Sequence, residues 1–361
     1  MEVALFFDCF MGRGGAERYA ISLAKYLDAD IYTSFVDWSK VDAELKMVTV
    51  NEIGLFFKDS KLLTRAEIAS RFLRLKVPSY DAYIFYGFHC LSAVSHHPNI
   101  WFPPAVLGYI YNDAEHDFVS RYLGAWQRPL FETWCSLYRI LDQKWSKRLD
   151  RIVANSKYTQ ENIKKYYGRD SWIVYEGIET GRFYCKSYED FFLVSSRLVK
   201  EKRIDLIVMA FKEMPNRSLI IAGDGPERKN LEDLAAGSDS IRFVGSLGYV
   251  DLIDLYSRCT ATIGMSISDS FPLVPLESMA SGKPSIGVNA TGYKESILPG
   301  KTGFLIEPTE EEIKRCVKLL TPESAKAMKK ACIERARVFD VSVCIEKLRE
   351  EIIDLVLSHS N

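Results

Sequence analysis

Short apolar runs alternate with stretches of helical periodicity along almost the whole chain, and this alternation is the strongest constraint on its fold. The chain opens with the apolar run VALFFD (Val3–Asp8), continues through a glycine-rich turn and reaches a helical pattern from Ala16 to Leu27. Apolar runs of this length, bounded by turn residues, are typical of strands buried on both faces of a parallel sheet. The alternation therefore predicts an α/β fold built from β-α units.

Further strands are expected where similar apolar runs recur. In the first half of the chain these are DAYIFYG (Asp81–Gly87), VLGYIYND (Val106–Asp113) and RIVANS (Arg151–Ser156), and a second series begins near Phe191. Each run is followed by a stretch of helical periodicity, as a parallel sheet requires for its crossover connections.

The alternation breaks near Tyr167–Trp172 and then starts again. A chain of 361 residues is long enough for two ordinary domains, each with its own core. We therefore predict two Rossmann-like domains, at residues 1–170 and 171–340. We expect the final helix, at about 341–361, to pack back on the first domain.

Composition excludes several classes of protein. A formal net charge of -1 argues against a dedicated nucleic-acid binder, which usually carries a strong basic excess. The eight cysteines form no C-x-x-C pair, which argues against a zinc or redox site and favours the reduced thiols of an intracellular protein. No apolar run approaches 18 residues, and the start MEVALFFDCF lacks the basic residues of a secretory signal. We expect a cytoplasmic protein.

The stretch from Phe118 to Leu149 is predicted to form one or two long helices in which aromatic and basic residues are interleaved. One interpretation is a helix that faces the core and has a solvated basic side. The other is a helix that rests on an anionic membrane surface, as basic aromatic-rich helices do. The sequence leaves both open.

Two glycine-containing turns follow predicted strands. GRGGAER (Gly12–Arg18) opens a helix, as phosphate-binding turns do, but its glycine spacing is not that of a dinucleotide site. AGDGPE (Ala222–Glu227) leaves a strand with two glycines, which would let the backbone approach a base or ribose. Tight turns without a ligand explain both segments equally well.

Charged residues stand where two more predicted strands end. In SRLVKEKRID, Arg197 and Lys202 would suit a diphosphate, although an ordinary solvated helix start is the alternative. In DSFPLVPLE, Asp269 precedes an apolar loop and Glu277 lies in the first turn of a helix. Glu277 would either contact a ligand hydroxyl or cap its helix.

Taken together, these segments have an order that strongly resembles one known family. GGxER, SRLxxEKxxD, AGxGP, FxG, D-SFxLxPLE-xMAxGKPxI and TGxxE resemble the motifs of the family 4 retaining glycosyltransferases. The resemblance covers nearly the whole chain and is strongest from Phe191 to Pro308. It implies the GT-B architecture, in which two Rossmann-like domains face each other, the first binds the acceptor, and the nucleotide sugar lies in the cleft.

The resemblance also implies roles for individual residues. Arg197 and Lys202 match the pair that binds the donor diphosphate. Asp269 and Glu277 match an E-x7-E motif whose first acid binds hydroxyls of the transferred sugar and whose second binds the ribose. Further donor contacts are implied for a loop that offers backbone amides, for the N-terminal turn and for the lining of the base: Phe271, Pro272, Leu273 and Val274; Gly14 and Gly15; Gly223 and Val244, respectively.

The chain departs from the family pattern at three places. Asp269 replaces the more usual Glu and shortens the reach by one methylene, and Pro272 replaces a frequent Gly and lacks an N–H. The family often has a histidine after the strand that corresponds to VLGYIYND. Here Tyr111 or Asn112 stands at that place, and His116 is the candidate a few residues further on, unless it is a surface histidine.

The resemblance implies transfer of a hexose from a nucleoside diphosphate sugar, with retention of anomeric configuration, in polysaccharide or lipid-linked glycan synthesis. GDP-mannose is the favoured donor and UDP-glucose the next. Neither metal nor cofactor is expected, since Arg197 and Lys202 would neutralise the diphosphate; the DAD segment (Asp28–Asp30) is interpreted as a loop. The acceptor would be a glycan or a lipid-linked sugar, and the basic helix would bring it from the inner face of a membrane.

Two other functions remain open at this point. One is a non-catalytic protein that binds nucleotide sugars, and the other is a sugar-phosphate synthase or epimerase on the same architecture.

Overall fold

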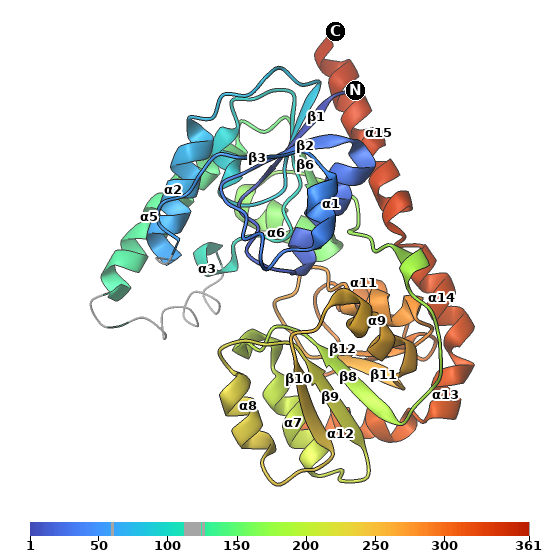
Figure 1. Cartoon of the computed structure of the whole chain (residues 1–361). Helices are drawn as coiled ribbons and strands as arrows, with labels where there is room; N and C mark the ends of the chain where they lie inside the picture. Colours follow the sequence, from blue (N-terminus) through green and yellow to red (C-terminus); the bar gives the residue numbers. More distant parts are fainter. Residues whose placement is uncertain (59–60, 112–123, 125–126, 361) are drawn as a thin grey trace. The chain divides into compact units, whose positions relative to one another are not determined.

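The computed structural model describes residues 1–58, 61–111, 124 and 127–360, which fall into two compact units (Figure 1). Unit 1 comprises Met1–Tyr175 and Cys344–Asn361, and unit 2 comprises Glu176–Val343. Each unit has its own parallel sheet and its own apolar core, so the predicted α/β class with two Rossmann-like domains is confirmed. Within the described residues, no helix combines the length and apolar composition needed to cross a membrane.

Unit 1 is built on a parallel sheet with the strand order β3-β2-β1-β4-β5-β6-β7. Its strands are β1 Val3–Phe7, β2 Ala29–Thr33, β3 Val50–Glu52, β4 Ala82–Phe85, β5 Asn99–Trp101, β6 Arg151–Ala154 and β7 Trp172–Ile173. The chain first moves from β1 towards β3 and then returns to place β4 on the other side of β1. The strand order therefore reverses between β1 and β4, and in open parallel sheets ligands bind beyond the carboxyl ends of the strands at such a point.

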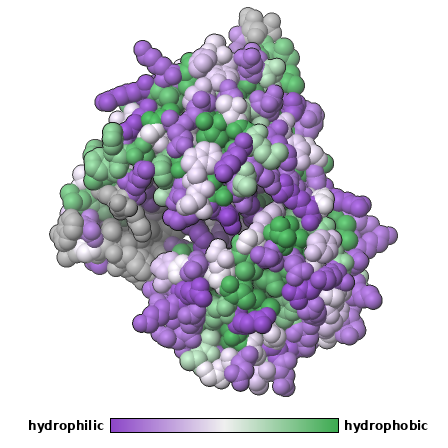
Figure 2. All heavy atoms as spheres, in the orientation of Figure 1, coloured by the Kyte–Doolittle hydropathy of each residue, from purple (hydrophilic) through white to green (hydrophobic). Residues whose placement is uncertain are grey.

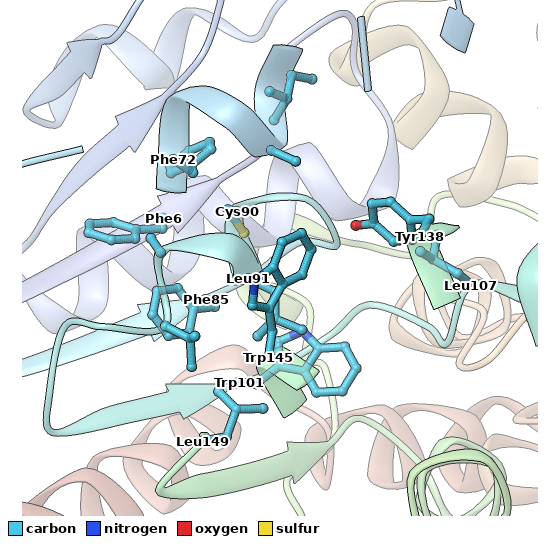
Figure 3. Packing of buried hydrophobic residues seen from close by; sticks show 14 of the residues in the cluster. Phe6, Phe72, Phe85, Cys90, Leu91, Trp101, Leu107, Tyr138, Trp145 and Leu149 are labelled. Carbon is cyan, nitrogen blue, oxygen red and sulfur yellow. The ribbon is translucent and has the colours of Figure 1, made fainter. Parts of the chain in front are cut away.

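The helices of unit 1 connect these strands and cover the sheet. They are α1 Gly15–Leu27, α2 Lys61–Leu73, α3 Gly108–Tyr111, α5 Gln127–Ser146, α6 Lys157–Tyr167 and α15 Val341–Ser360, with short 3-10 helices η1 Ala43–Met47 and η2 Cys90–Ala93. The core beneath them is rich in aromatic side chains, among them Phe6, Phe85, Trp101 and Trp145 (Figure 3).

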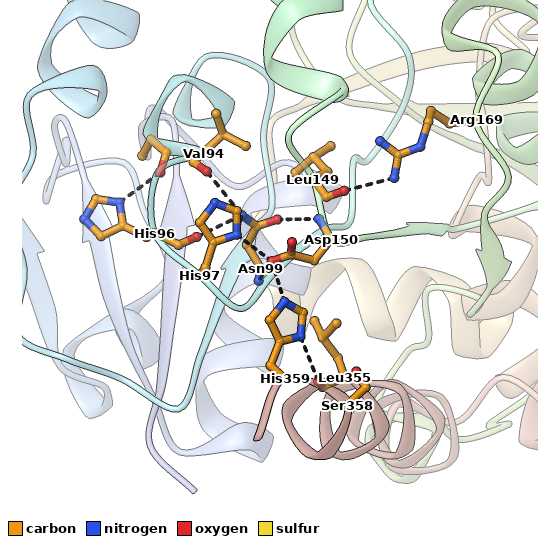
Figure 4. A network of polar contacts seen from close by, with 11 residues as sticks. Val94, His96, His97, Asn99, Leu149, Asp150, Arg169, Leu355, Ser358 and His359 are labelled. Carbon is orange, nitrogen blue, oxygen red and sulfur yellow. Dashed lines mark hydrogen bonds and ion pairs between the residues drawn. The ribbon is translucent and has the colours of Figure 1, made fainter. Parts of the chain in front are cut away.

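The last helix, α15, is held to the rest of unit 1 by polar contacts. The Arg151 guanidinium donates to carboxylate oxygens of Glu351 (2.8 Å) and Asp354 (2.7 Å). Nearer the C-terminus, Nε2 of His359 lies 3.5 Å from Oδ2 of Asp150, which also accepts from the backbone N–H of Asn99 (Figure 4). These contacts tie α15 to the segments that begin β5 and β6.

Unit 2 repeats the plan with the strand order β10-β9-β8-β11-β12-β13, again all parallel. Its strands are β8 Phe191–Ser195, β9 Ser218–Ala222, β10 Ile241–Gly245, β11 Ala261–Gly264, β12 Ser285–Val288 and β13 Gly303–Ile306. Its order reverses between β8 and β11. That pair of strands is therefore the equivalent of β1 and β4 in unit 1.

The helices of unit 2 form two layers on its sheet. In one layer α7 (Ile204–Lys212) contacts α8 (Arg228–Ala235) and α12 (Glu310–Leu319). In the other, α10 contacts its neighbours α9, α11 and α14. The bounds of this second group and of the remaining short helices are α9 Tyr249–Arg258, α10 Val274–Ala280, α11 Tyr293–Ser296, α13 Pro322–Ala327, α14 Lys329–Arg337, η3 Thr180–Arg182 and η4 Lys200–Lys202.

One predicted strand is wrong. The run VLGYIYND does not form a strand in its described part, Val106–Tyr111, and contains helix α3 instead. Leu107 and Ile110, three residues apart, are its buried side chains, which is helical spacing. The strand of this region is β5, which lies earlier in the chain and is too short to show as an apolar run.

Helix α5 is the described part of the predicted basic and aromatic helix. Its aromatic residues face the core: Tyr138 and Trp145 are buried, and Trp134 packs against the same cluster. The opposite face carries exposed apolar and basic side chains (Figure 2). The helix therefore places its aromatic rings inside, as the first interpretation expects, but its outer face is not purely polar.

Candidate functional site

The strongest concentration of predicted site residues lies at the reversal point of the sheet in unit 2. Arg197 and Lys202 come from the segment that follows β8, and Asp269 comes from the loop that follows β11. These segments leave neighbouring parallel strands, so their side chains meet at the same edge of the sheet. This is the edge at which ligands bind in open α/β sheets.

Lys202 and Asp269 form an ion pair across this edge. The ammonium nitrogen of Lys202 lies 2.6 Å from Oδ1 and 2.7 Å from Oδ2 of Asp269, although the two residues are 67 positions apart. Each side chain is 22% exposed, so the pair is partly open to solvent. A partly exposed pair of this kind can exchange its contacts for those of a ligand at modest cost, because such pairs contribute only ~1 kcal/mol or less to stability.

Arg197 lies two residues after the last residue of β8 and is exposed. Its guanidinium makes no hydrogen bond or ion pair with any residue that the structure describes. A guanidinium offers five N–H donors in a rigid fork that matches phosphate oxygens. The edge therefore carries one paired cation and one whose donors face solvent.

The loop between Asp269 and α10 is held in place by packing. The Phe271 ring is buried and lies 5.5 Å from the ring of Phe339. Pro272 is also buried, whereas Leu273 and Val274 remain partly exposed. The Phe271 side chain thus anchors the loop and is not itself available to a ligand.

A glycine fixes the same loop from the other side. A Cβ on Gly292 would come within 2.3 Å of the Ser270 carbonyl oxygen and 2.7 Å of the Cα of Phe271. The backbone of the TGxxE segment therefore rests directly on the loop, which explains why this position holds a glycine.

Glu277 lies deeper than the ion pair. Its side chain is only 1% exposed, and Oε2 accepts a hydrogen bond of 2.7 Å from the hydroxyl of Tyr256 on α9. The carboxylate therefore links α10 to α9. Nothing in the sequence pattern singled out Tyr256, since it is one apolar-face residue of an ordinary amphipathic helix.

Gly223 has a structural role that the sequence did not reveal. Its φ is +139°, and a Cβ there would lie 1.8 Å from the carbonyl oxygen of Ser196. A Cβ on Gly225 would similarly lie 2.4 Å from the carbonyl oxygen of Leu198. Both glycines are thus required for the exit of β9 to pack on the segment that carries Arg197, whether or not a ligand is bound. Val244, near the end of β10, is half-buried.

The glycine turn of unit 1 is less constrained. Gly14 is the N-cap of α1, and a Cβ on it would meet only the end of the Glu17 side chain. Gly15 is the first residue of this 13-residue helix. The first turn of a helix has backbone N–H groups without intrahelical acceptors and carries a partial positive charge. The turn can therefore approach an anion without strain.

Other predicted positions lie elsewhere. Asn112 and His116 fall outside the described residues. Asp30, in the DAD segment, is the second residue of β2 and accepts a hydrogen bond of 2.7 Å from the Tyr80 hydroxyl. Asp28 is the C-cap of α1 with φ 53°. The two aspartates are thus part of a helix-to-strand connection at the amino ends of the strands.

The structure adds Asp8, which sequence reasoning missed. It follows β1 directly, and its carboxylate accepts hydrogen bonds from the backbone N–H groups of Phe88, His89 and Cys90, with N···O distances from 2.7 to 3.2 Å. The carboxylate therefore joins the exits of β1 and β4 at the reversal point of unit 1. The only sequence signal was an acid placed between an apolar run and a glycine-rich turn.

Two family sequence models match the chain in succession. Glycosyltransferase Family 4 matches residues 13–182, and Glycosyl transferases group 1 matches residues 185–339. Their boundary falls where the structure passes from unit 1 to unit 2. Each half of the chain thus matches a glycosyltransferase family. The two parallel α/β sheets are those of the GT-B fold.

Individual relatives support the family at lower coverage. The chain is 31% identical to the sulfoquinovosyl transferase of Arabidopsis thaliana over 164 residues, 43% of this chain and 31% of that protein. It is 24% identical to an uncharacterized glycosyltransferase of Methanocaldococcus jannaschii over 213 residues, 57% of this chain and 60% of that protein. The matches thus span about a third to three-fifths of the length of these relatives.

Among solved structures, the Anabaena protein HepE in complex with UDP-glucose has the same fold. The TM-score is 0.74, with 18% sequence identity, and the alignment covers 98% of this chain and all of that one. At this identity the likeness shows the fold and not the substrate.

Proposed function

We propose that the protein transfers a hexose from a nucleoside diphosphate sugar to a hydroxyl of a glycan or lipid-linked acceptor, with retention of configuration. The observation that carries the proposal is the Lys202–Asp269 ion pair beside the exposed guanidinium of Arg197, at the reversal point of the sheet in unit 2. Cations for a diphosphate and an acid for sugar hydroxyls stand side by side there, which is what a nucleotide sugar needs.

In this proposal Lys202 has two partners in turn. Without donor its ammonium neutralises Asp269. With donor bound, the ammonium and the guanidinium of Arg197 contact the diphosphate, and Asp269 accepts hydrogen bonds from hydroxyls of the transferred sugar. Fixed cations next to the phosphate stabilise the charge that develops on it as the sugar leaves. Glu277 binds the ribose by exchanging its contact with Tyr256 for the ribose hydroxyls.

The bond changes balance without a further reagent. The bond between the anomeric carbon and the diphosphate oxygen breaks, and a bond from the acceptor oxygen to that carbon forms on the same face. The acceptor's proton passes to the leaving diphosphate, so no side-chain base is required for it. The products are the glycosylated acceptor and the nucleoside diphosphate.

Two nucleotide sugars are candidates for the donor. The sequence pattern favours GDP-mannose, and the fold neighbour HepE was solved with UDP-glucose. Asp269 is one methylene shorter than the glutamate usual in the family, so it reaches less far towards the sugar. A panel with both nucleotides and several hexoses, read first by thermal shift and then by product formation, identifies the donor, because a bound donor stabilises the fold.

The site is tested by four single substitutions under the same assay. Arg197→Ala, Lys202→Ala and Glu277→Gln are each expected to lower kcat/KM for the donor on the order of 100-fold. The first two remove a cation from the diphosphate, and the third removes the charged acceptor for the ribose hydroxyls. Lys200→Ala is the matched control, since Lys200 is an exposed lysine in the same 3-10 turn as Lys202. Full activity in the first three variants would show that the donor binds elsewhere.

The same measurements distinguish the other candidate functions. Donor binding without transfer to any acceptor and without donor hydrolysis would favour a non-catalytic nucleotide-sugar-binding protein. A product formed with a free sugar phosphate would indicate a synthase. Activity that rises with added Mn²⁺ and disappears with EDTA would contradict a metal-independent reaction.

We also propose that helix α5 contacts an anionic membrane surface. The exposed side chains on one face of the helix and just beyond it, here called the α5 stripe, are Leu130, Leu137, Ile140, Leu141, Lys144, Lys147 and Arg148. Figure 2 shows apolar surface over this side of unit 1. Apolar residues flanked by basic ones suit the boundary between headgroups and acyl chains.

Co-sedimentation with vesicles tests the α5 stripe. Wild-type protein is expected to bind vesicles that contain phosphatidylglycerol and not those of phosphatidylcholine alone, and binding should weaken with salt. The double variant Leu137→Gln/Leu141→Gln should lose this binding, whereas Leu319→Gln, an equally exposed leucine of unit 2, should keep it. Equal binding by all three proteins would remove the proposal.

A further inference from the structure

The reversal point of unit 1 carries polar groups that the proposed donor site does not use. His89 follows the carboxyl end of β4 and precedes η2, and Asp8 follows the neighbouring strand β1. The Asp8 carboxylate is engaged by three backbone N–H groups, including that of His89 itself. The imidazole ring of His89 therefore remains available to a ligand at this edge.

The His89 ring is held by one nitrogen only. It is 5% exposed, and its Nδ1 lies 2.7 Å from the hydroxyl oxygen of Tyr138. That hydroxyl donates to the carbonyl oxygen of Phe88 (3.2 Å). Because a phenol has a single proton, we assign the Nδ1–H of His89 as the donor to the Tyr138 oxygen, which leaves a lone pair on Nε2.

The second nitrogen, Nε2, has no hydrogen-bond partner among the residues that the structure describes. It is also absent from the fully buried polar atoms that lack a partner, so it keeps access to solvent. Burial lowers the pKa of His89 to about 4, against the opposing charge of Asp8, and the nearby charge of Arg65 lowers it further. The ring is therefore neutral at pH 7 and offers an acceptor, not a charge.

Arg65 lies on α2, which packs against η2, the short helix that His89 precedes, and its charge lowers the pKa of His89. Its guanidinium lies over the ring of Tyr109, with the central carbon 4.5 Å from the ring centroid. It is partly buried, and it makes no hydrogen bond or ion pair with the described residues. Arg71 of the same helix, by contrast, donates to Glu67 and to the backbone carbonyl of Ile53.

A partly buried guanidinium without a counter-ion is unusual, because charged groups removed from water are generally paired. The Asp8 carboxylate at this edge is already occupied by backbone N–H groups. A ligand that completes both unmet groups must bring negative charge for Arg65 and a hydrogen-bond donor for Nε2 of His89. A phosphate ester with a neighbouring hydroxyl has both features.

We propose that Arg65 and His89 form an acceptor subsite in unit 1, in which the guanidinium binds the phosphate of an anionic acceptor and Nε2 accepts a hydrogen bond from its neighbouring hydroxyl. That the bound molecule is the acceptor rests on the proposed transfer reaction. That the subsite binds a hydroxylated phosphate ester does not depend on it. The subsite selects acceptors by charge and positions a hydroxyl, and it takes no part in donor binding.

Histidine NMR with glycerol 3-phosphate as the probe tests the subsite directly. The chain has five histidines, and the His89 signal is identified as the one that disappears in His89→Asn. Asparagine keeps an N–H near the position of Nδ1 for Tyr138 and removes the acceptor nitrogen. We expect the ¹⁵N shift of His89 to move saturably with the probe in wild type and not with glycerol.

The matched variants decide whether Arg65 is responsible. Arg65→Gln should lose the response, with an affinity at least 10-fold weaker, while Arg74→Gln, an exposed arginine just beyond the same helix, should retain it. No shift in wild type, or the same shift in Arg65→Gln, would overturn the proposal. Circular dichroism of each variant shows whether the fold is kept.

Two further experiments complete the test. One identifies the source of the phosphate, and the other distinguishes a failure of the proposed function from a failure of the subsite. Binding to phosphatidylglycerol vesicles that depends on Arg65 in addition to the α5 stripe would identify a lipid headgroup, whereas a response to glycerol 3-phosphate alone would identify a soluble ester. Lys202→Ala should respond to the probe as wild type does. If that variant responds while wild type shows no donor binding, the proposed function fails and the subsite stands.

Discussion

The two sheets each carry an aspartate beyond a central strand, but the two carboxylates are stabilised by different partners. Asp8 in unit 1 accepts from backbone N–H groups of Phe88, His89 and Cys90. Asp269 in unit 2 accepts from the ammonium of Lys202. Backbone donors are part of the fold, whereas a lysine side chain can turn to another partner.

This difference separates a structural acid from a ligand-binding one. Removing Asp8 leaves three backbone donors without their acceptor and unties the exits of β1 and β4. Removing Asp269 releases one flexible cation that water can solvate, since both side chains are partly exposed. A carboxylate that binds substrate has to give up its resting partner, and only the second arrangement allows that at low cost.

The comparison predicts the largest effect for Asp8→Ala. Hydrogen bonds to a charged group contribute more than neutral ones, and losing this set should lower the free energy of unfolding by about 3 kcal/mol. The measurement is the urea midpoint together with amide hydrogen exchange at residues 88–90, which should accelerate. Asp170→Ala, an exposed carboxylate of the same unit, is the control and should change stability little. A loss no greater than in Asp170→Ala would show that Asp8 is not a structural acid.

Much of this architecture was predictable because parallel strands buried on both faces read as apolar runs. The exceptions are short elements. β5 and β7 have only three and two residues and leave no pattern, and the residues of α3 have apolar positions that suit a strand as well as a helix. Short elements are decided by tertiary packing, which a local pattern does not contain.

The candidate site was predictable only through the order of its motifs. The contact between Lys202 and Asp269 joins positions 67 residues apart, and no local spacing encodes it. For the glycines, the local sequence looks the same although their structural roles differ. Gly14 and Gly223 look alike in sequence, yet a Cβ would strike the Ser196 backbone at Gly223 and only a flexible side chain at Gly14. Whether a glycine serves the fold or a ligand depends on its neighbour in space.

A third carboxylate, Asp142 of α5, differs from both because its environment makes stability depend on pH. It is buried and accepts from the hydroxyls of Tyr111 (2.7 Å) and Tyr167 (2.6 Å). Burial raises the pKa of Asp142 to about 6, against the two hydrogen bonds, which lower it. Because this pKa is above the unfolded value of about 3.9, the folded state holds the proton more tightly.

The stability that Asp142 contributes is therefore fully present below about pH 4 and is lost as the pH rises through about 6. A shift of about 2 pKa units corresponds to roughly 3 kcal/mol. In Asp142→Asn the side chain cannot ionise, so its free energy of unfolding relative to wild type should rise by about that amount between pH 4 and 7. Urea unfolding across this range, with Asp170→Asn as the control, measures it. A difference that does not change with pH would mean that Asp142 is not the group responsible.

The smallest effect on stability is expected for Asp269→Asn. This variant is the strictest test of the difference between Asp8 and Asp269. Asparagine keeps one acceptor oxygen for Lys202 but loses the charge, and a partly exposed ion pair contributes ~1 kcal/mol or less. The free energy of unfolding should therefore change by less than about 1 kcal/mol.

Asp269→Asn should affect binding of the donor sugar more than it affects stability. In Asp269→Asn the sugar hydroxyls meet a weaker, uncharged acceptor, so the thermal shift given by the preferred donor should shrink while that given by the free nucleoside diphosphate persists. In Asp8→Ala, measured at a temperature where the variant is folded, both shifts should persist, because Asp8 holds only the backbone of unit 1. If Asp269→Asn instead unfolds as readily as Asp8→Ala and still binds the donor sugar fully, then the Lys202 pair is a structural clamp, and the sugar contact must be sought among the amides of the loop that Phe271 anchors.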